Sequence, residues 1–177
     1  MHYVVVFALL PACILVAQAA SFYSAPEGSE PTYSFSSPVG SGSGSSYVLS
    51  GEGRITAVRV WENYNNYIYG IQIRHGFTWS SVAGYSYGTP QEIELRENEA
   101  IIQISGKYAH YLRSLIFTTN QGRTLYAGQP YGHSFNMYPE HPQAELLFVS
   151  GRYHGALTAI AAHWGTPGSF ISNSTRH

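Results

Sequence analysis

Apolar and polar residues alternate in short runs along most of this chain, the pattern of strands with one buried face. The runs are rich in β-branched and aromatic residues, and Gly, Asn, Pro or His residues separate them. Helical spacing of apolar positions is not sustained over a helix-length stretch. The pattern therefore predicts an all-β fold with strands over residues 54–61, 67–74, 91–95, 100–106, 112–119, 123–126, 144–151 and 157–164.

One segment of this pattern occurs three times. Val149-Ser150-Gly151-Arg152-Tyr153 reproduces Ile104-Ser105-Gly106-Lys107-Tyr108 after 45 residues, and Leu157 and Ile160 follow Leu112 and Leu115 at the same spacing. A fainter copy lies 44 residues upstream, at Val60, Tyr64, Ile68 and Ile71. Three copies predict three small antiparallel sheets around one core, closed with pseudo-threefold symmetry and with binding loops at one end of the axis.

The chain begins with an apolar run, Val4 to Ala17, followed by the small-x-small pattern Ala17-Gln18-Ala19. These features predict a signal peptide over residues 1–20 and hence secretion. The run has no Lys or Arg before it, so a buried helix or a membrane anchor remains the alternative, although the run is shorter than the ~20 residues of a spanning helix. The single cysteine, Cys13, lies in this leader, so the mature chain has no disulfide.

Composition divides the remainder into three parts. Residues 21–39 are rich in Ser, Pro and Glu and predict a flexible N-terminal segment, and residues 40–166 carry the β-pattern and predict one domain. Residues 167–177 form a polar tail that contains the glycosylation sequon Asn173-Ser174-Thr175.

The charged residues argue against several functions. The net charge is −1, so the chain gives little long-range attraction for nucleic acid or acidic membrane. It contains no aspartate, no G-x-S-x-G turn and no closely spaced histidine pair, so we expect no metal site or catalytic triad. Two glutamate pairs, Glu92/Glu94 and Glu97/Glu99, could in principle act as paired acids, but their spacing is more typical of a solvated strand face and turn.

Glycine, tyrosine and histidine supply the candidate binding residues. The stretch Gly40 to Ser46 is either a flexible linker or a loop whose glycines let the backbone approach a ligand. His110 and His154 follow the two clear copies of the repeat, in loops expected at the same end of the body. Together these loops predict a shallow polar cup lined by Gly42, Gly44, Tyr108, His110, Tyr111, Tyr153 and His154, which suits hydroxyl-rich ligands.

At these residues the sequence resembles the jacalin-related lectins, in particular their animal secretory, zymogen-granule lectin-like branch. The resemblance covers about residues 40 to 164 and rests on five segments: Ile55 to Val60, Ser105 to Tyr108, His133 to Asn136, Val149 to Arg152 and His163-Trp164. It implies a β-prism of three four-stranded antiparallel Greek-key sheets. It also implies sugar binding at one end of the prism, without catalysis or cofactor.

The resemblance implies a site made of three segments: Gly42-Ser43-Gly44, Tyr108-Ala109-His110-Tyr111, and Tyr153-His154-Gly155-Ala156-Leu157-Thr158. The family's binding loop usually reads G-x-x-x-D, whereas this chain has His154 and Thr158 at the two defining positions. A hydroxyl accepts weaker hydrogen bonds than a carboxylate, by about 2 kcal/mol for such a site. His154 can fill part of the pocket or supply a pH-dependent contact. We therefore expect altered specificity.

The functional hypothesis is a secreted lectin, located extracellularly or in a secretory-granule lumen, whose partners are glycans or glycoproteins. Ser45 and Ser46 stand where the secretory branch has basic residues, which implies weak glycosaminoglycan binding at most. Nucleic acid and membrane insertion are not expected. The alternatives are a protein-interaction or packaging module that has lost sugar binding and, third, an enzyme.

Overall fold

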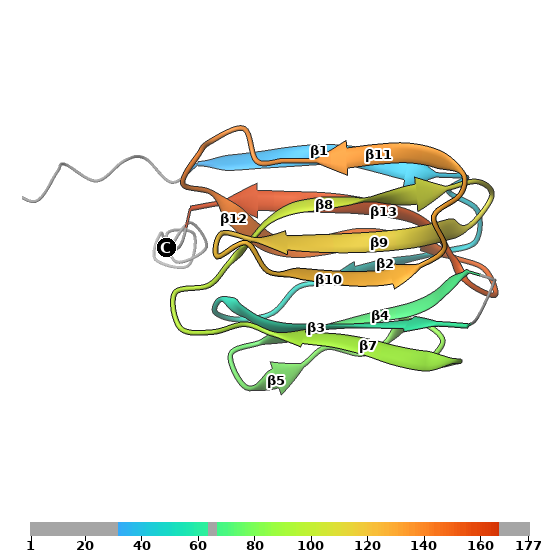
Figure 1. The fold of residues 1–177 in the computed structure, drawn as a ribbon, viewed down its shortest axis with the longest axis horizontal. Helices are drawn as coiled ribbons and strands as arrows, with labels where there is room; N and C mark the ends of the chain where they lie inside the picture. The colour runs from blue at the N-terminus through green and yellow to red at the C-terminus, as the bar shows by residue number, and fades with distance from the viewer. Residues whose placement is uncertain (1–31, 64–66, 167–177) are drawn as a thin grey trace, which may run out of the picture.

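The computed structural model describes residues 32–63 and 67–166. Within them, three antiparallel sheets surround one core (Figure 1). Sheet A has the order β1 (Tyr33–Gly40), β13 (Leu157–Gly165), β12 (Glu145–Tyr153), β2 (Ser45–Leu49). Sheet B has the order β5 (Thr78–Trp79), β4 (Ile68–His75), β3 (Ile55–Glu62), β7 (Thr89–Glu94), and β6 (Ala83–Gly84) also pairs with β4. Sheet C has the order β10 (Thr124–Gly128), β9 (Leu112–Thr119), β8 (Ile101–Tyr108), β11 (His133–Met137).

Each sheet is built on one long hairpin, and the three hairpins are the three copies of the repeated segment. The hairpins are β3–β4, β8–β9 and β12–β13. Their equivalent residues Ile71, Leu115 and Ile160 are all 0% exposed, so each copy contributes the same apolar position to the shared core. The predicted all-β prism with pseudo-threefold symmetry is confirmed. β8 and β12 end, and β9 and β13 begin, at the right-hand end in Figure 1, which we call the loop end.

Packing against an aromatic ring explains the glycine of the repeated Ser-Gly-(Lys/Arg)-Tyr motif. Gly106 pairs with Phe135 of β11, and Gly151 pairs with Tyr47 of β2. A Cβ atom on Gly106 would stand 3.0 Å from the Phe135 ring, and one on Gly151 would stand 2.7 Å from the Tyr47 ring. Each glycine therefore makes room for an aromatic ring that the neighbouring strand turns toward the core.

The core supplies the stability that a chain without disulfides needs. Its largest fully buried side chains include Trp164, Phe117 and Ile71, one from each long hairpin. Burial of such side chains stabilises the fold by roughly 1.5–3 kcal/mol each relative to exposure. Two polar groups of large core side chains are hydrogen-bonded: the Trp164 indole N–H donates to Ser36 Oγ at 2.8 Å, and the Tyr47 hydroxyl donates to the Ala159 carbonyl at 3.1 Å. Burial raises the pKa of that Tyr47 hydroxyl.

The predicted flexible segment over residues 21–39 is wrong for residues 33–39. These residues form most of β1, an edge strand paired with β13 from Tyr33↔Gly165 to Gly40↔Ala159. The register shifts between Ser36 and Val39, around Pro38. Proline is tolerated at such edge irregularities because its missing N–H is not needed there. Residues 21–31, the predicted signal peptide and the tail with Asn173 lie outside the described residues.

The Gly/Ser stretch is a loop inside the domain rather than a linker before it. Gly40 ends β1, Ser45 begins β2, and both strands belong to sheet A. Besides β1, four strands were not predicted as strands: β2, β5, β6 and β11. Two of them have only two residues each, and β2 and β11 are edge strands with Ser, His or Asn on the outer positions.

Candidate functional site

The Gly-rich loop, residues 41–44, is fastened to the start of β13. The Thr158 hydroxyl donates a 2.6 Å hydrogen bond to the Ser43 carbonyl, and the Gly42 N–H donates to the Thr158 carbonyl at 3.4 Å. On the other side, Arg152 Nη1 donates to the Gly44 carbonyl at 2.7 Å. A Cβ on Gly44 would stand 2.1 Å from the Tyr153 carbonyl oxygen, so only glycine allows this approach. The loop and the β12–β13 turn thus form one unit.

Thr158 lies inside this unit. It is 0% exposed, and its hydroxyl is engaged by the Ser43 carbonyl. The structure therefore brings Thr158 to the predicted site but gives it a supporting position beneath the loop. Ala156, another predicted site residue, is also buried, at 1% exposed.

The β12–β13 turn presents two of its residues to solvent. His154 and Gly155 are exposed, and the turn is closed by the His154 N–H, which donates to the Ala156 carbonyl at 2.9 Å. Tyr153 is half-buried and meets the Tyr85 ring edge-on with centroids 6.1 Å apart. Gly155 and Gly42 both have positive φ, and nothing lies within 4 Å of where their Cβ atoms would stand. Both glycines therefore leave the backbone open to a ligand.

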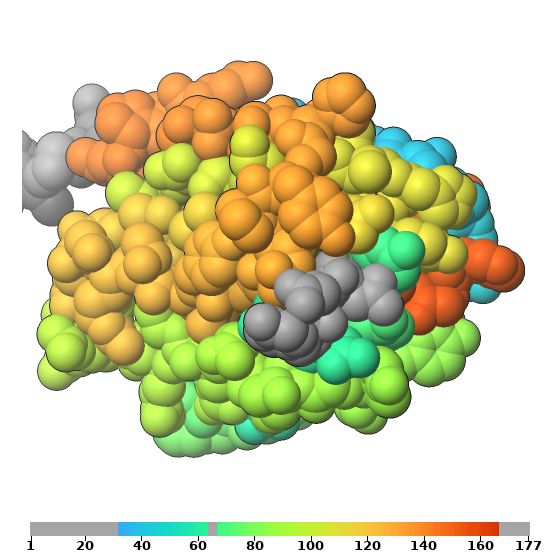
Figure 2. Space-filling model, turned by 45° about the vertical axis from the view of Figure 1, so that its right-hand side comes forward, coloured from blue at the N-terminus to red at the C-terminus, as the bar shows by residue number. Residues whose placement is uncertain are grey.

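The β8–β9 turn lies at the same end but is held by different neighbours. The Ala109 N–H donates to the Tyr111 carbonyl at 2.9 Å, which closes the turn. Tyr111 packs on Tyr67 with ring centroids 4.5 Å apart and meets His110 edge-on at 4.7 Å. Tyr108 packs against His133 at 5.6 Å. Figure 2, which brings the loop end forward, shows the β8–β9 turn in yellow beside the start of β4 in green and the β12–β13 turn in orange-red.

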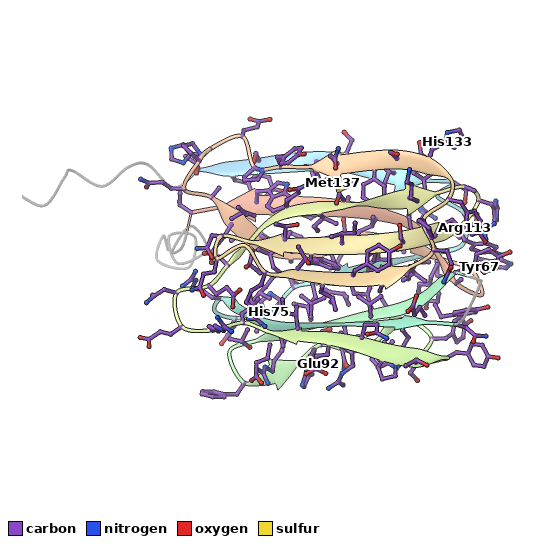
Figure 3. All side chains as sticks on the ribbon, in the orientation of Figure 1. Tyr67, His75, Glu92, Arg113, His133 and Met137 are labelled. Carbon is purple, nitrogen blue, oxygen red and sulfur yellow. The ribbon has the colours of Figure 1, made fainter. Side chains whose placement is uncertain are left out.

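Sequence reasoning missed an arginine at this end. The Arg113 guanidinium lies between the rings of Tyr67 and Tyr131, 4.4 Å and 4.7 Å from their centroids, and its Nη1 donates to the Tyr131 hydroxyl at 2.7 Å. Its buried Nε has no partner among the described residues. Figure 3 shows Arg113 and Tyr67 together at the loop end. Arg113 stands two residues after Tyr111 in the sequence, and this closeness to a predicted site residue could have indicated it.

Three of the four glutamates in the two pairs form ion pairs with arginines. Glu92 pairs with Arg59 at 2.6 Å, and Glu94 pairs with Arg74, both on sheet B. Glu99, expected in a solvated turn, is instead buried at 3% exposed, and its carboxylate accepts from Arg123 at 2.6 Å. Burial alone would raise the pKa of Glu99, but hydrogen bonds from Thr119, the Arg96 N–H and Arg123 outweigh it and lower the pKa.

The described residues, 32–63 and 67–166, lack both metal-binding clusters and membrane-spanning helices. They contain no cluster of three His, Cys, Asp or Glu side chains that could hold a metal ion. They also contain no helix of the length and apolarity needed to cross a membrane. What the loop end offers is open backbone, tyrosine rings, imidazoles and an arginine, a set that can hold a polar, hydroxyl-bearing ligand.

Comparison with known proteins decides the family. The sequence profile of the jacalin-like lectin domain matches residues 36–163. The chain belongs to the jacalin-like lectin domain family. It is 43% identical to rat zymogen granule membrane protein 16 over 75% of this chain and 81% of that protein. The human protein of the same name is 44% identical over 74% of this chain and 80% of its own length. The predicted resemblance to the animal branch of the family is thereby confirmed.

Solved structures give the same result for the fold. A prostate-specific WGA16 glycoprotein lectin is 33% identical, with a TM-score of 0.68, over 76% of this chain and 99% of its own. Malaysian banana lectin has a TM-score of 0.64 at 22% identity over 77% of this chain and 100% of its own, a likeness of fold. The jacalin-like lectins and these neighbours are non-enzymatic carbohydrate-binding proteins, so this member of the family is not an enzyme.

Proposed function

We propose that this jacalin-like domain binds glycans at the loop end, through the unit formed by the Gly-rich loop and the β12–β13 turn. The observation that carries the proposal is the pair of open glycines, Gly42 and Gly155, on two segments fastened by the Thr158–Ser43 hydrogen bond. A ligand can approach both backbones without meeting a side chain. His154, Tyr153 and, across the end, Tyr111 supply polar groups and ring faces for sugar hydroxyls and C–H surfaces.

The specificity differs from that of a family member with aspartate at position 158. A carboxylate there could accept hydrogen bonds from two neighbouring sugar hydroxyls, and such charge-assisted bonds are about twice as strong as neutral ones. Thr158 has a single hydroxyl, and its proton is already donated to the Ser43 carbonyl. Recognition therefore depends on backbone groups, on His154 and on tyrosine rings. We therefore expect weaker mannose binding than in a family member with aspartate at this position.

The Thr158→Asp variant tests that specificity. An ionised carboxylate cannot donate to the Ser43 carbonyl, so we expect it to turn toward the ligand side of the loop. The variant should then bind mannosides more tightly than the natural protein in isothermal titration. An unchanged or lower affinity for mannose would contradict the assignment of the altered specificity to position 158.

A glycan array tests the function itself. The natural protein should bind at least one class of glycan, and Tyr111→Ala and Tyr153→Ala should weaken that binding. Tyr138→Ala is the matched control, since Tyr138 is 54% exposed and its hydroxyl contacts Gln103 in sheet C. A flat array would contradict the proposal. A protein partner whose binding ignores free sugars and changes at Thr158 would favour the alternative interaction or packaging module.

The site of action in this proposal is the secretory pathway. The apolar run over residues 4–17 supports export, and two relatives are named zymogen granule membrane protein 16. The proposed partners are glycans or glycoproteins in a granule lumen or outside the cell. Expression with a C-terminal tag should place the protein in the culture medium or in granules, with an N-terminus near residue 20 or 21; retention in the cytosol would contradict it.

A further inference from the structure

A hollow with both polar and apolar lining lies away from the loop-end site, on sheet C. It has a volume of about 290 Å³. The lining includes the Tyr126 ring, the Lys107 ammonium and the polar side chains of Ser105, Ser134 and Asn136. This volume is close to the lower end, ~300 Å³, of the range for small-ligand sites, which suits one sugar ring rather than a longer chain.

The sheet register explains how these residues meet. Across β8 and β11, Lys107 pairs with Ser134 and Ser105 pairs with Asn136. Across β9 and β10, Ile116 pairs with Tyr126, and Ile116 also pairs with Ser105. The order Tyr126, Ile116, Ser105, Asn136 therefore runs straight across the four strands. The aromatic ring lies on one side and the amide on the other.

Sheet A carries an equivalent hollow, and the two differ in chemistry. It too has a volume of about 290 Å³, and it is built on the other clear copy of the motif, with Ser150 and Arg152 in place of Ser105 and Lys107. Val48 pairs with Ser150 as Asn136 pairs with Ser105, and Ala161 takes the place of Ile116. Phe35, 46% exposed, also lines it. Both sheets carry the hollow, but Asn136 and Tyr126 line the one on sheet C.

The polar groups of the sheet C hollow are available to a ligand. Within residues 32–63 and 67–166, the side chains of Ser105 and Asn136 have no hydrogen-bond partner. Lys107 Nζ donates to Ser134 Oγ at 2.7 Å and meets no carboxylate in this part of the chain. Tyr126 is 47% exposed. An amide and a hydroxyl both donate and accept, as vicinal sugar hydroxyls do, and an ammonium offers three donors.

We propose that the sheet C hollow binds one pyranose ring of a glycan. The C–H face of the sugar lies on the Tyr126 ring, and vicinal hydroxyls bond with Asn136, Ser105 and Lys107. This site is additional to the loop-end site and does not depend on it. Lys107 is the next-to-last residue of β8, and the loop-end site is built from segments of sheet A, so the two sites lie on different sheets.

An NMR titration of the ¹⁵N-labelled full-length protein tests the proposal. The probes are the methyl pyranosides of mannose, galactose, N-acetylglucosamine and glucuronic acid, each at millimolar concentration, the range expected for a single ring. At least one should shift the Asn136 side-chain amide and the Gly106 backbone amide. Asn136→Val, which copies the sheet A lining, should weaken that binding at least about tenfold, or remove it. Val48→Ala, at the equivalent place on sheet A, should leave it unchanged.

The outcomes separate the two sites. Gly42→Ala should remove the chemical-shift changes at the loop end and leave those on sheet C, because Gly42 belongs to the loop-end site and does not line the sheet C hollow. If none of the four probes shifts the sheet C signals, the second site does not exist. If the sheet C shifts persist unchanged in a folded Asn136→Val variant, with native chemical-shift dispersion, the site assignment is overturned.

Discussion

The hydroxyl of Thr158 donates a 2.6 Å hydrogen bond to the carbonyl of Ser43, which joins the start of β13 to the Gly-rich loop 115 residues earlier in the sequence. Thr158 itself is fully buried. Thr158 thus joins the Gly-rich loop to the β12–β13 turn. Together with the Gly42–Thr158 and Arg152–Gly44 hydrogen bonds, this bond holds the Gly-rich loop against the β12–β13 turn.

Replacing Thr158 by Val tests the fastening. Valine keeps the shape but has no hydroxyl, so the Ser43 carbonyl loses its donor beside a buried methyl group. We expect the free energy of unfolding to fall by about 2 kcal/mol and glycan binding to weaken. Urea denaturation measures the first effect and titration calorimetry the second. Thr118→Val, half-buried on β9 and without a side-chain bond among the described residues, should change neither; equal losses in both variants would refute the role of the hydroxyl.

Glu99 should account for part of the loss of folding stability at acidic pH. Its pKa is lowered in the folded protein, so its contribution is complete above the ordinary value of ~4.3 and is lost as the pH falls through the folded-state pKa. Glu99→Gln should lower the free energy of unfolding by about 2 kcal/mol at neutral pH, and by progressively less below pH ~4.3.

The control for Glu99 is its exposed neighbour. Glu97→Gln removes a carboxylate two residues away whose side chain makes no ion pair among the described residues. It should leave the unfolding free energy within about 0.5 kcal/mol of the natural value. A constant difference between the natural protein and Glu99→Gln at every pH would argue against the titration of this carboxylate.

We expect His163 to cause a second, smaller pH dependence of the folding stability. Burial lowers the pKa of its imidazole, which bonds with Tyr33 and Ser150 and stacks on Phe148 with centroids 3.9 Å apart. Stability from this neutral imidazole is complete above the ordinary pKa of ~6.5 and is lost as the pH falls below it. Urea midpoints should therefore decrease between about pH 7.5 and about pH 5. His163→Phe, which cannot titrate, should show a smaller decrease; an identical slope would exclude His163 as its source.

The long hairpins could be predicted because their buried positions alternate and recur. Ile104, Leu115 and Ile160 lie in runs of β-branched or leucine residues, and all three prove fully buried. The edge strands β1, β2 and β11 were not predicted because they lack such runs. In β1, Tyr33 and Phe35 alternate with serines, and the strand is recognised only through its pairing with β13.

The candidate site was predictable in position but not in role. Glycine and turn spacing indicated that the segments around Gly42 and His154 share one end. That Thr158 points into the protein depends on where the Ser43 carbonyl lies, which no local pattern contains. The enclosure of Arg113 by Tyr67 and Tyr131 likewise joins segments from three hairpins or loops, and it is visible only after folding.

In the proposed site, glycans contact the open backbone of the Gly-rich loop, and a matched pair of glycine variants tests this contact. Gly42 and Gly53 both have positive φ, 69° and 81°, and both have nothing within 4 Å of a new Cβ, so alanine strains the backbone alike at the two positions. Only Gly42 lies in the proposed site.

The measurement is glycan-array binding by the natural protein, Gly42→Ala and Gly53→Ala, with melting temperatures recorded for all three. We expect similar melting temperatures for the two variants, retained binding by Gly53→Ala and loss of binding by Gly42→Ala, whose methyl group would stand where the sugar approaches. Equal glycan binding by the two variants, or binding by none of the three proteins, would contradict the claim.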